Sequence, residues 1–557
     1  MSDEVEDEVE GEVEGEVHPW WNPHSSKFWS LLFMLGIILH IIVTSVSEIG
    51  LDAHVHATYV SVEDGGGEDR LDWGHTRPVD SQSSDPSYSP EIGGTYWAWH
   101  AWLGLWFDVM GHSTEALQTG ALLLAAVMLF IVWRCTERLY GTEEAARLTA
   151  LVSINPALLF AAGRVYPEEF MLIAISIALL TLLLGLRTGG KGMSLLWLMA
   201  PAAVLFGATV KGIDPTAAVL IFIIGFIAFA VDESNDLLVK VTRRPHRAFI
   251  ASSGAVVMVF LGFALFAPAG LTVSSLREAP MRFLSAVIFS LLDVVIIFML
   301  LGMVLWPFIK DSLRAGFMVV DREAGLLAGV IGGMTTAIVL YVAALWTHES
   351  LLWNAEWPWM IWTMGNNGRY ATMLMIPCFW YVMRIRQLQI EDSDEGKEVE
   401  EEAQYLSLEN LGVKWKSVLI GICLLLPLSL LVAFHGQTSW TGDAAEYIST
   451  EMEDDQDFLF VSEATLGMHW LYSFHLEVDA DGTRNITGHW RAMDSAWQDE
   501  LLNGTEFEDR GDLSNVNWLV LSPEVAEEFS HQDWQQVDSG IAPWMNGGGE
   551  WVILSKN

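Results

Sequence analysis

The feature that most constrains this chain is a series of long apolar runs separated by polar segments. The first run, residues 28–47, has about 20 residues, the length at which an α-helix crosses the hydrocarbon core of a bilayer. Similar runs follow at 117–133, 148–163, 169–186, 194–210, 215–231, 248–267, 284–309, 324–346, 370–383 and 417–434. Hydrophobic residues make up 52% of the 557 positions, as in a polytopic membrane protein. We therefore predict about eleven transmembrane helices.

Basic residues in the short loops predict the orientation of these helices. They gather in every second loop, namely Arg134, Arg138 and Arg147; Arg187 and Lys191; Lys240, Arg243, Arg244 and Arg247; Lys310, Arg314 and Arg322; and Arg384, Arg386, Lys414 and Lys416. Lysine and arginine are enriched in cytoplasmic loops. We therefore place these loops and the N-terminus in the cytoplasm, and the alternate loops and the segment after residue 434 outside.

Composition divides the chain into three parts. Residues 1–27 are predicted to be an acidic, disordered cytoplasmic tail, because they repeat Glu-Val and Gly-Glu units. Residues 28–434 form the predicted membrane domain, with a first outer loop at 48–116 and an acidic cytoplasmic loop at 385–416. The aromatic segment 95–111 of the outer loop is typical of a helix lying in the membrane interface.

Residues 435–557 are predicted to be a small extracytoplasmic α/β domain. Alternating and apolar stretches predict strands at 457–462, 518–521 and 551–554, and helices at 443–452 and 523–529. The net charge of −41 excludes nucleic acid as a partner, because few basic residues are available to neutralise phosphates. The three cysteines lie in or beside apolar runs and predict neither disulfides nor a zinc site.

The stretch from Glu48 to His56 follows the first apolar run and contains Asp52, His54 and His56. Ionisable groups avoid the hydrocarbon region unless they have a function. Two interpretations stay open for this stretch: a functional site, or ordinary loop residues at the end of a helix.

Motifs spread over residues 28–383 occur in an order similar to that of the GT-C superfamily of membrane glycosyltransferases. The chain resembles especially the branch of dolichyl-phosphate-mannose protein mannosyltransferases and lipid A aminoarabinose transferases. The motifs are Gly50-Leu-Asp52-Ala-His54, Tyr96-Trp-Ala-Trp-His100, Leu139-Tyr-Gly-Thr-Glu-Glu-Ala-Ala-Arg147, Asn155-Pro156, Gly163-Arg-Val-Tyr-Pro-Glu168-Glu169, Gly207-Ala-Thr-Val-Lys211-Gly and Gly368-Arg369-Tyr370. The chain departs from many relatives at Ala53, where they carry a second acid.

The resemblance implies transfer of a sugar from a polyprenyl-phosphate donor in the membrane lipid to a protein, lipid or glycan acceptor on the outer face. Asp52 is then the candidate base for the acceptor, because a hydroxyl or amide is a poor nucleophile. Lys211 and Arg369, with Arg164, would bind the donor phosphate. A single direct displacement would invert the anomeric centre.

Other candidate residues keep two interpretations. His54 and His56 bind substrate or, with Asp52, a divalent metal such as Mg or Mn. Glu168 positions the acceptor or the sugar, or caps the helix after Pro167. His348 and Glu349 bind substrate or face solvent. Lys211 and Arg164 bind the donor phosphate or extend to the membrane interface. Arg369 binds the donor phosphate or anchors its helix.

Two other functions are compatible with the apolar runs. A transporter or flippase for a lipid-linked or acidic solute would carry internal repeats and ionisable groups at mid-membrane. A non-catalytic membrane scaffold would present the acidic outer domain, but it leaves the shared outer location of Asp52, Lys211 and Arg369 without a reason.

Overall fold

The structure is a computed structural model, and it describes most of the chain. The described residues are 22–23, 25–61, 71–72, 96–188, 193–211, 219, 223, 240–302, 310, 312, 314–352, 357–358, 361, 365–394, 414–434, 439–480, 483–503, 513–526, 529–543 and 548–556. The predicted acidic tail up to residue 21 lies outside them, as do most of the predicted span at 215–231 and the acidic loop from 395 to 413.

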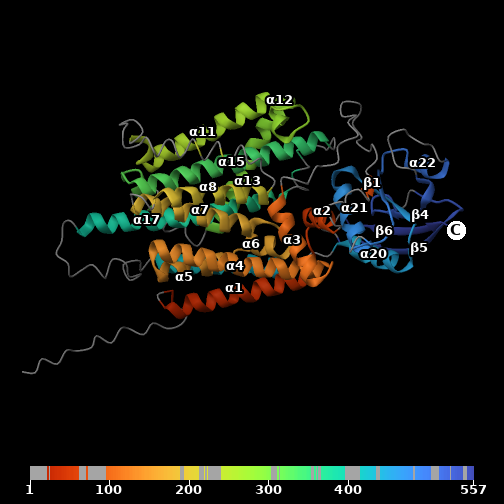
Figure 1. Ribbon diagram of the computed structural model, residues 1–557, viewed down its shortest axis with the longest axis horizontal. Coiled ribbons are helices and arrows are strands. Elements are labelled where there is room, and N and C mark those ends of the chain that lie inside the picture. The colour runs from red at the N-terminus through yellow and green to blue at the C-terminus, as the bar shows by residue number, and fades with distance from the viewer. Residues whose placement is uncertain are drawn as a thin grey trace, which may run out of the picture.

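A bundle of long helices forms the larger part of the molecule (Figure 1). Its helices are α1 (Ser26–Val46), α4 (Thr114–Tyr140), α7 (Glu168–Thr188), α8 (Met193–Val210), α11 (Pro245–Phe266), α13 (Pro280–Gly302), α15 (Arg322–Leu352), α17 (Met375–Asp394) and α19 (Lys414–Phe434). By length and composition, seven described helices could cross a membrane, or eight if one bent pair counts as a span. The chain is a multi-pass membrane protein, and the number eleven stays a prediction.

The bent pair replaces the single span predicted at 148–163. It consists of α5 (Thr142–Ser153) and α6 (Pro156–Gly163), which meet at an angle of 58°. Asn155 caps α6, because its side-chain oxygen accepts hydrogen bonds from the backbone N–H groups of Ala157, at 2.9 Å, and Leu158, at 3.2 Å. Pro156 has no N–H to donate and favours the first helical position. The predicted span at 370–383 likewise begins as a 3₁₀ helix, η5 (Gly365–Leu374), before α17.

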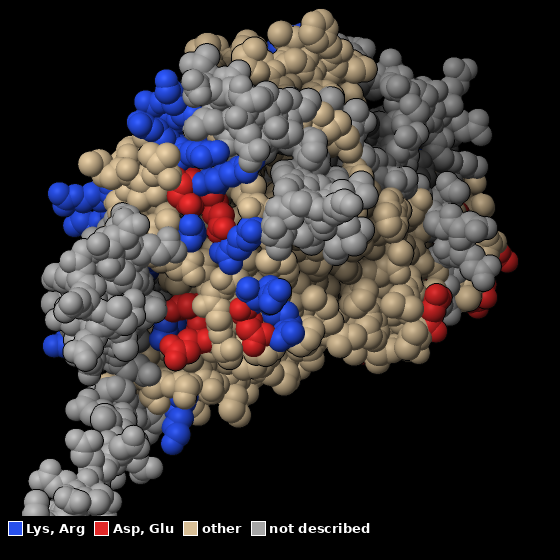
Figure 2. Space-filling model, turned by 60° about the vertical axis from the view of Figure 1, so that its left-hand side comes forward, with Lys and Arg blue, Asp and Glu red and all other residues tan. Residues whose placement is uncertain are grey.

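Ion pairs fasten three helices together at the end of the bundle away from the C-terminal domain. Arg187 near the end of α7 contacts Glu323 of α15 at 2.8 Å. Arg384 of α17 contacts Asp321, just before α15, at 2.9 Å and Glu323 at 3.7 Å. Figure 2 shows basic and acidic side chains next to one another on this end. These pairs of opposite charge hold the ends of α7, α15 and α17 together.

The C-terminal domain is built on a six-stranded sheet in the order β1-β3-β2-β4-β6-β5. The strands are β1 (Leu71–Asp72), β2 (Asp457–Ser462), β3 (Gly488–Ala492), β4 (Val516–Leu521), β5 (Trp534–Ile541) and β6 (Glu550–Lys556). Strands β1 to β4 pair in parallel, while β6 runs antiparallel to β4 and β5. The α/β fold and the three predicted strands are therefore present. The edge strand β1 comes from the first outer loop, which the sequence assigned to the membrane domain.

The helices of this domain differ in part from the prediction. Helix α20 (Trp440–Glu451) matches the helix predicted at 443–452, whereas the helix predicted at 523–529 is wrong, because residues 523–526 form a turn. The sequence did not predict α21 (Ala464–Val478), which packs on the sheet through Phe474 against Phe458 and Phe460. Burial of aromatic side chains on one face holds α21 against the sheet.

Two helices of the first outer loop lie between the bundle and the C-terminal domain (Figure 1). They are α2 (Leu51–Val60) and α3 (Trp97–Met110). Helix α3 is the predicted aromatic helix. Helix α2 corrects the loop interpretation of the Glu48 to His56 stretch, because most of that stretch is helical. It packs against α21 on one side and α3 on another. Groups on α2 are thereby presented both to the bundle and to the C-terminal domain.

Small residues let α15 approach α11 closely, as is common between membrane helices. A Cβ atom on Gly332 of α15 would lie 2.6 Å from the backbone oxygen of Phe249. The Gly332 carbonyl accepts a hydrogen bond from the Ser253 hydroxyl at 3.1 Å. On α11 itself, a Cβ atom on Gly254 meets no described atom within 4 Å.

We therefore expect Gly332→Val to destabilise the bundle by about 1–3 kcal/mol, because the two backbones must separate to admit the side chain. Gly254→Val is the matched control and is expected to change stability less. Thermal unfolding of the two purified variants in detergent, followed by size-exclusion chromatography, measures the difference. Equal midpoints for both variants would contradict this account of the packing.

Candidate functional site

A buried ion pair lies where η5, the start of α7 and α2 meet. The Arg369 side chain is 3% exposed and that of Glu168 is fully buried, and Nε of Arg369 lies 2.7 Å from Oε1 of Glu168. Nη2 of Arg369 lies 3.3 Å from Oδ2 of Asp52, whose side chain is 46% exposed. The cation is therefore enclosed, and Asp52 is the carboxylate at its open edge.

Aromatic rings hold the two cations of this site. The Arg369 guanidinium carbon lies 4.0 Å from the ring centroid of Tyr166 and 5.3 Å from that of Tyr370. Nζ of Lys211, just after α8, lies 5.1 Å from the same Tyr370 ring. Cations are attracted to the faces of aromatic rings. Tyr370 therefore brings Lys211 and Arg369 to one site, although they lie on different segments.

The turn before α2 needs the glycine of the Gly50-Leu-Asp52 motif. A Cβ atom on Gly50 would lie 2.4 Å from the Tyr166 hydroxyl oxygen. The Gly50 N–H donates to the carbonyl of Arg164 at 3.0 Å, which joins this turn to the α6–α7 connection. Arg164 itself is buried, with its guanidinium carbon 3.6 Å from the ring centroid of Phe160. The close backbone contact sets the position of Asp52 relative to Arg369.

Electrostatics keep Asp52 ionised. Desolvation alone would raise the pKa of this carboxyl, but the positive charges of Arg369 and Lys211 outweigh it and lower the pKa to about 2. Nη1 of Arg369 is buried and has no hydrogen-bond partner among the described residues. A buried donor of this kind is costly unless a ligand completes it. The site thus combines an ionised acid with a cation that can still bind an anion.

The two histidines of α2 lie on different faces. Nδ1 of His54 contacts the Gly50 carbonyl at 3.0 Å, and its Nε2 contacts the Ser473 hydroxyl of α21 at 3.3 Å. His56, four residues after Asp52, instead contacts His100 of α3, with 3.0 Å between Nδ1 and Nε2. Burial lowers the pKa of His54 to about 4, and burial together with His100 lowers that of His56 to about 3. Both imidazoles are therefore neutral at pH 7.

This arrangement does not fit the metal site considered from the sequence. Asp52, His54 and His56 were expected to reach one ion from an irregular loop. Instead, all three lie on helix α2, which turns His54 to a different face from Asp52 and His56. Among the described residues, no group of three or more His, Cys, Asp or Glu side chains could hold a metal ion.

The structure brings together Asp52, Glu168, Arg369 and Lys211 from four separate motifs. It places His348 and Glu349 near the end of α15, with His348 buried. Sequence reasoning missed His469 of α21, whose Nε2 lies 3.6 Å from Oδ1 of Asp52. No sequence signal singled it out, because neither α21 nor its contact with α2 was predicted.

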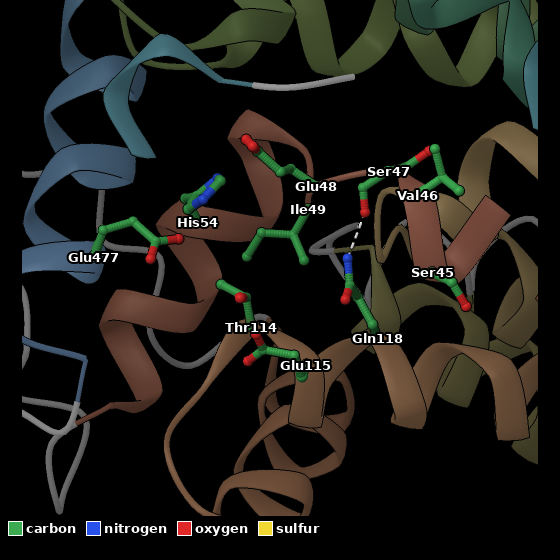
Figure 3. A pocket seen from close by; sticks show the side chains of 10 residues that line it. All are labelled: Ser45, Val46, Ser47, Glu48, Ile49, His54, Thr114, Glu115, Gln118 and Glu477. Atoms are coloured by element: carbon green, nitrogen blue, oxygen red, sulfur yellow. Dashed lines mark hydrogen bonds between the residues drawn. The ribbon is translucent and has the colours of Figure 1, made fainter. Parts of the chain in front are cut away.

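A cavity of about 180 Å³ lies beside α2, next to His54. Figure 3 shows that three carboxylates, those of Glu48, Glu115 and Glu477, surround it. The Glu48 carboxylate accepts a hydrogen bond from the backbone N–H of Ser439, the N-cap of α20. Glu48 therefore joins the end of α1 to the C-terminal domain.

The charge of Glu48 is expected to make stability depend on pH. Desolvation, together with Glu477 and Asp443, raises its pKa to about 7, although the Ser439 hydrogen bond acts in the opposite direction. An acid with a raised pKa binds more protons in the folded state, so its contribution to stability falls as the pH rises from about 4.5 towards 7.

Glu48→Gln keeps an oxygen for the Ser439 N–H and removes the titration. We expect the fall in melting temperature between about pH 5 and about pH 8 to be smaller in this variant than in the unchanged protein. Glu446→Gln, on the exposed face of α20, is the control and is expected to leave the fall unchanged. The same fall in both variants would show that Glu48 does not titrate in this range.

Comparisons with known proteins bear on the whole fold. No protein-family model matches the chain, and no curated protein matches it in sequence. ArnT from Cupriavidus metallidurans, solved bound to undecaprenyl phosphate, matches with a TM-score of 0.50 and 12% identity, over 95% of this chain and 98% of that chain. Its apo state gives the same values. The Archaeoglobus fulgidus oligosaccharyltransferase in complex with Zn and sulfate matches with a TM-score of 0.41 and 12% identity, over 88% of this chain and 67% of its own.

The match to ArnT includes almost all of both chains, so it concerns the helical bundle and the C-terminal domain together. The fold that the motif resemblance implied is thereby confirmed. This multi-pass membrane protein has the fold of ArnT from Cupriavidus metallidurans.

Proposed function

We propose that the protein is a membrane glycosyltransferase that uses a polyprenyl-phosphate-linked sugar as its donor and works on the outer face of the membrane. The observation that carries this proposal is the ionised, half-exposed Asp52 at the open edge of the buried Arg369–Glu168 pair. A transferase of this kind needs an acid for the acceptor and cations for the leaving phosphate. The ArnT fold supports the proposal, because ArnT was solved with undecaprenyl phosphate.

In the proposed reaction, the donor phosphate binds between Arg369 and Lys211. Nη1 of Arg369 donates to a phosphate oxygen, and Lys211 adds a point charge, so that both stabilise the negative charge that grows as the sugar leaves. Arg164, on the neighbouring turn, adds positive charge. The acceptor hydroxyl or amide attacks the anomeric carbon from the opposite side while Asp52 accepts its hydrogen bond. One displacement inverts that carbon without a covalent sugar intermediate.

The remaining candidates would bind the sugar or the acceptor. His56 lies on the same face of α2 as Asp52, and Glu168 orients Arg369. His54 would act through α2, which it fastens to Ser473. His348 and Glu349 would contact substrate from α15. Dependence on Mg or Mn is tested by adding a chelator, and no step of the reaction is assigned to a metal.

The function is tested by incubating the purified protein with undecaprenyl phosphate carrying a hexose or an aminopentose, with and without chelator. We expect release of undecaprenyl phosphate from at least one donor, and loss of about a hundredfold or more in Asp52→Asn, because the neutral amide cannot take a proton. Asp108→Asn, on the exposed side of α3, is the matched control. Binding of the lipid phosphate without turnover of any donor would favour a transporter.

Lys211→Met is expected to weaken binding of undecaprenyl phosphate about tenfold while leaving the fold intact, because it removes one charge and keeps the apolar stem. Lys240→Met, exposed just before α11, serves as the control. The shift in melting temperature with lipid-phosphate concentration gives both affinities. Equal affinities in the two variants would remove Lys211 from the phosphate site.

A further inference from the structure

The C-terminal domain reaches into the site through one side chain. His469 lies on α21, and its Nε2 is 3.6 Å from Oδ1 of Asp52. Arg369 contacts the other oxygen of the same carboxylate, Oδ2, at 3.3 Å. Asp52 therefore lies between a permanent cation from the bundle and an imidazole from the C-terminal domain.

Two contacts fix α21 against α2 at this point. One contact is that of His469 with Asp52. The other joins Ser473, one helical turn after His469, to Nε2 of His54, which is two residues after Asp52 on α2. The spacing of four residues places His469 and Ser473 on one face of α21. The side chain of His469 is 22% exposed, and its Nδ1 is buried without a partner among the described residues. The accessible edge of the ring is therefore the one that faces Asp52.

We propose that His469 is the final acceptor of the proton that the acceptor group loses, and that Asp52 holds the imidazolium that forms. This inference rests on the proposed function. In the step, the acceptor O–H or N–H bond breaks as its oxygen or nitrogen bonds to the anomeric carbon. The bond from that carbon to the donor phosphate oxygen breaks, and its electron pair stays on the phosphate. The proton ends on Nε2 of His469.

The charges of the two groups suit these roles. Asp52, with a pKa lowered to about 2, stays ionised but is a weak base, so it cannot retain the proton at neutral pH. Burial lowers the pKa of His469, which is therefore neutral before the reaction, while Asp52 acts in the opposite direction and favours the charged ring. A neutral imidazole beside an ionised carboxylate is the arrangement of an efficient general base.

The chain contains a matched control for this pair. In the same domain, Nδ1 of His531 lies 3.6 Å from Oδ2 of Asp533, and the His531 side chain is 32% exposed. The two pairs thus share residue types, distance and similar exposure of the imidazole. They differ in that only His469 contacts the proposed site.

The first test measures release of undecaprenyl phosphate from the undecaprenyl-phosphate sugars across about pH 5 to 8. We expect the unchanged protein to lose activity at acidic pH as His469 becomes protonated. We expect His469→Gln to reduce the rate about a hundredfold at neutral pH and to remove this acidic loss. Undecaprenyl-phosphate binding and melting temperature should stay unchanged in His469→Gln, and imidazole in the buffer should restore activity to His469→Ala.

The control variant His531→Gln should behave like the unchanged protein. Unchanged rates and pH profile in His469→Gln would overturn the proposal.

The second test needs no donor. Carbethoxylation of His469 by diethyl pyrocarbonate, followed by mass spectrometry, reports the neutral fraction of the ring. We expect Asp52→Asn to shift the midpoint of this reaction with pH downwards at His469 and to leave His531 unchanged. An unchanged midpoint at His469 would overturn the proposal. If instead the proposed function were wrong, the unchanged protein would turn over no donor while the midpoint shift persisted.

Discussion

The buried contact between Arg369 and Glu168 is the interaction on which the rest of the site depends. Taking both charges out of water is costly. Removing one partner of such a pair lowers protein stability by about 3–5 kcal/mol, so the two side chains must stay in contact. Glu168 is the first residue of α7 and Arg369 belongs to η5, so the pair fixes two segments against each other. Because Glu168 occupies only one edge of the guanidinium, Nη2 contacts Asp52, and Nη1 has no hydrogen-bond partner among the described residues. The low pKa of Asp52 follows from this arrangement.

The same helices are fastened at their other ends by Arg187, Glu323 and Arg384. Helix α7 therefore carries a buried acid of the site at its first turn and an ion-paired arginine at its last. Between these ends it carries no charged side chain, and dispersion and close packing hold its mainly apolar side chains against their neighbours. Among the described residues, charged side chains gather at the two ends of the bundle, with Asp293 near the middle of α13 as an exception. A transporter would instead place such groups at mid-membrane.

The sequence predicted the long helices well, because an apolar run of about 20 residues has few alternatives to a membrane span. The motifs also named Asp52, Lys211 and Arg369 as candidates before their positions were known. Helix α2 was missed because it has no apolar face with helical periodicity, and its polar and apolar side chains face two different domains. The break at Asn155 was missed because a capping residue inside an apolar run does not change its hydropathy. His469 could not be found from local pattern, since only the packing of α21 on α2 gives it a neighbour.

This packing bears on the role of the C-terminal domain. A domain that merely covered the bundle would contact it through surface residues far from Asp52. Here α2 is held from both sides: Arg369 of the bundle contacts Asp52, while Ser473 and His469 of the C-terminal domain contact His54 and Asp52. Any displacement of the domain therefore changes the surroundings of the acid itself. Since Glu48 also contacts the first turn of α20, both ends of the Glu48 to His56 stretch depend on how the domain is seated. The position of the candidate base is thus a property of the interface between the two domains.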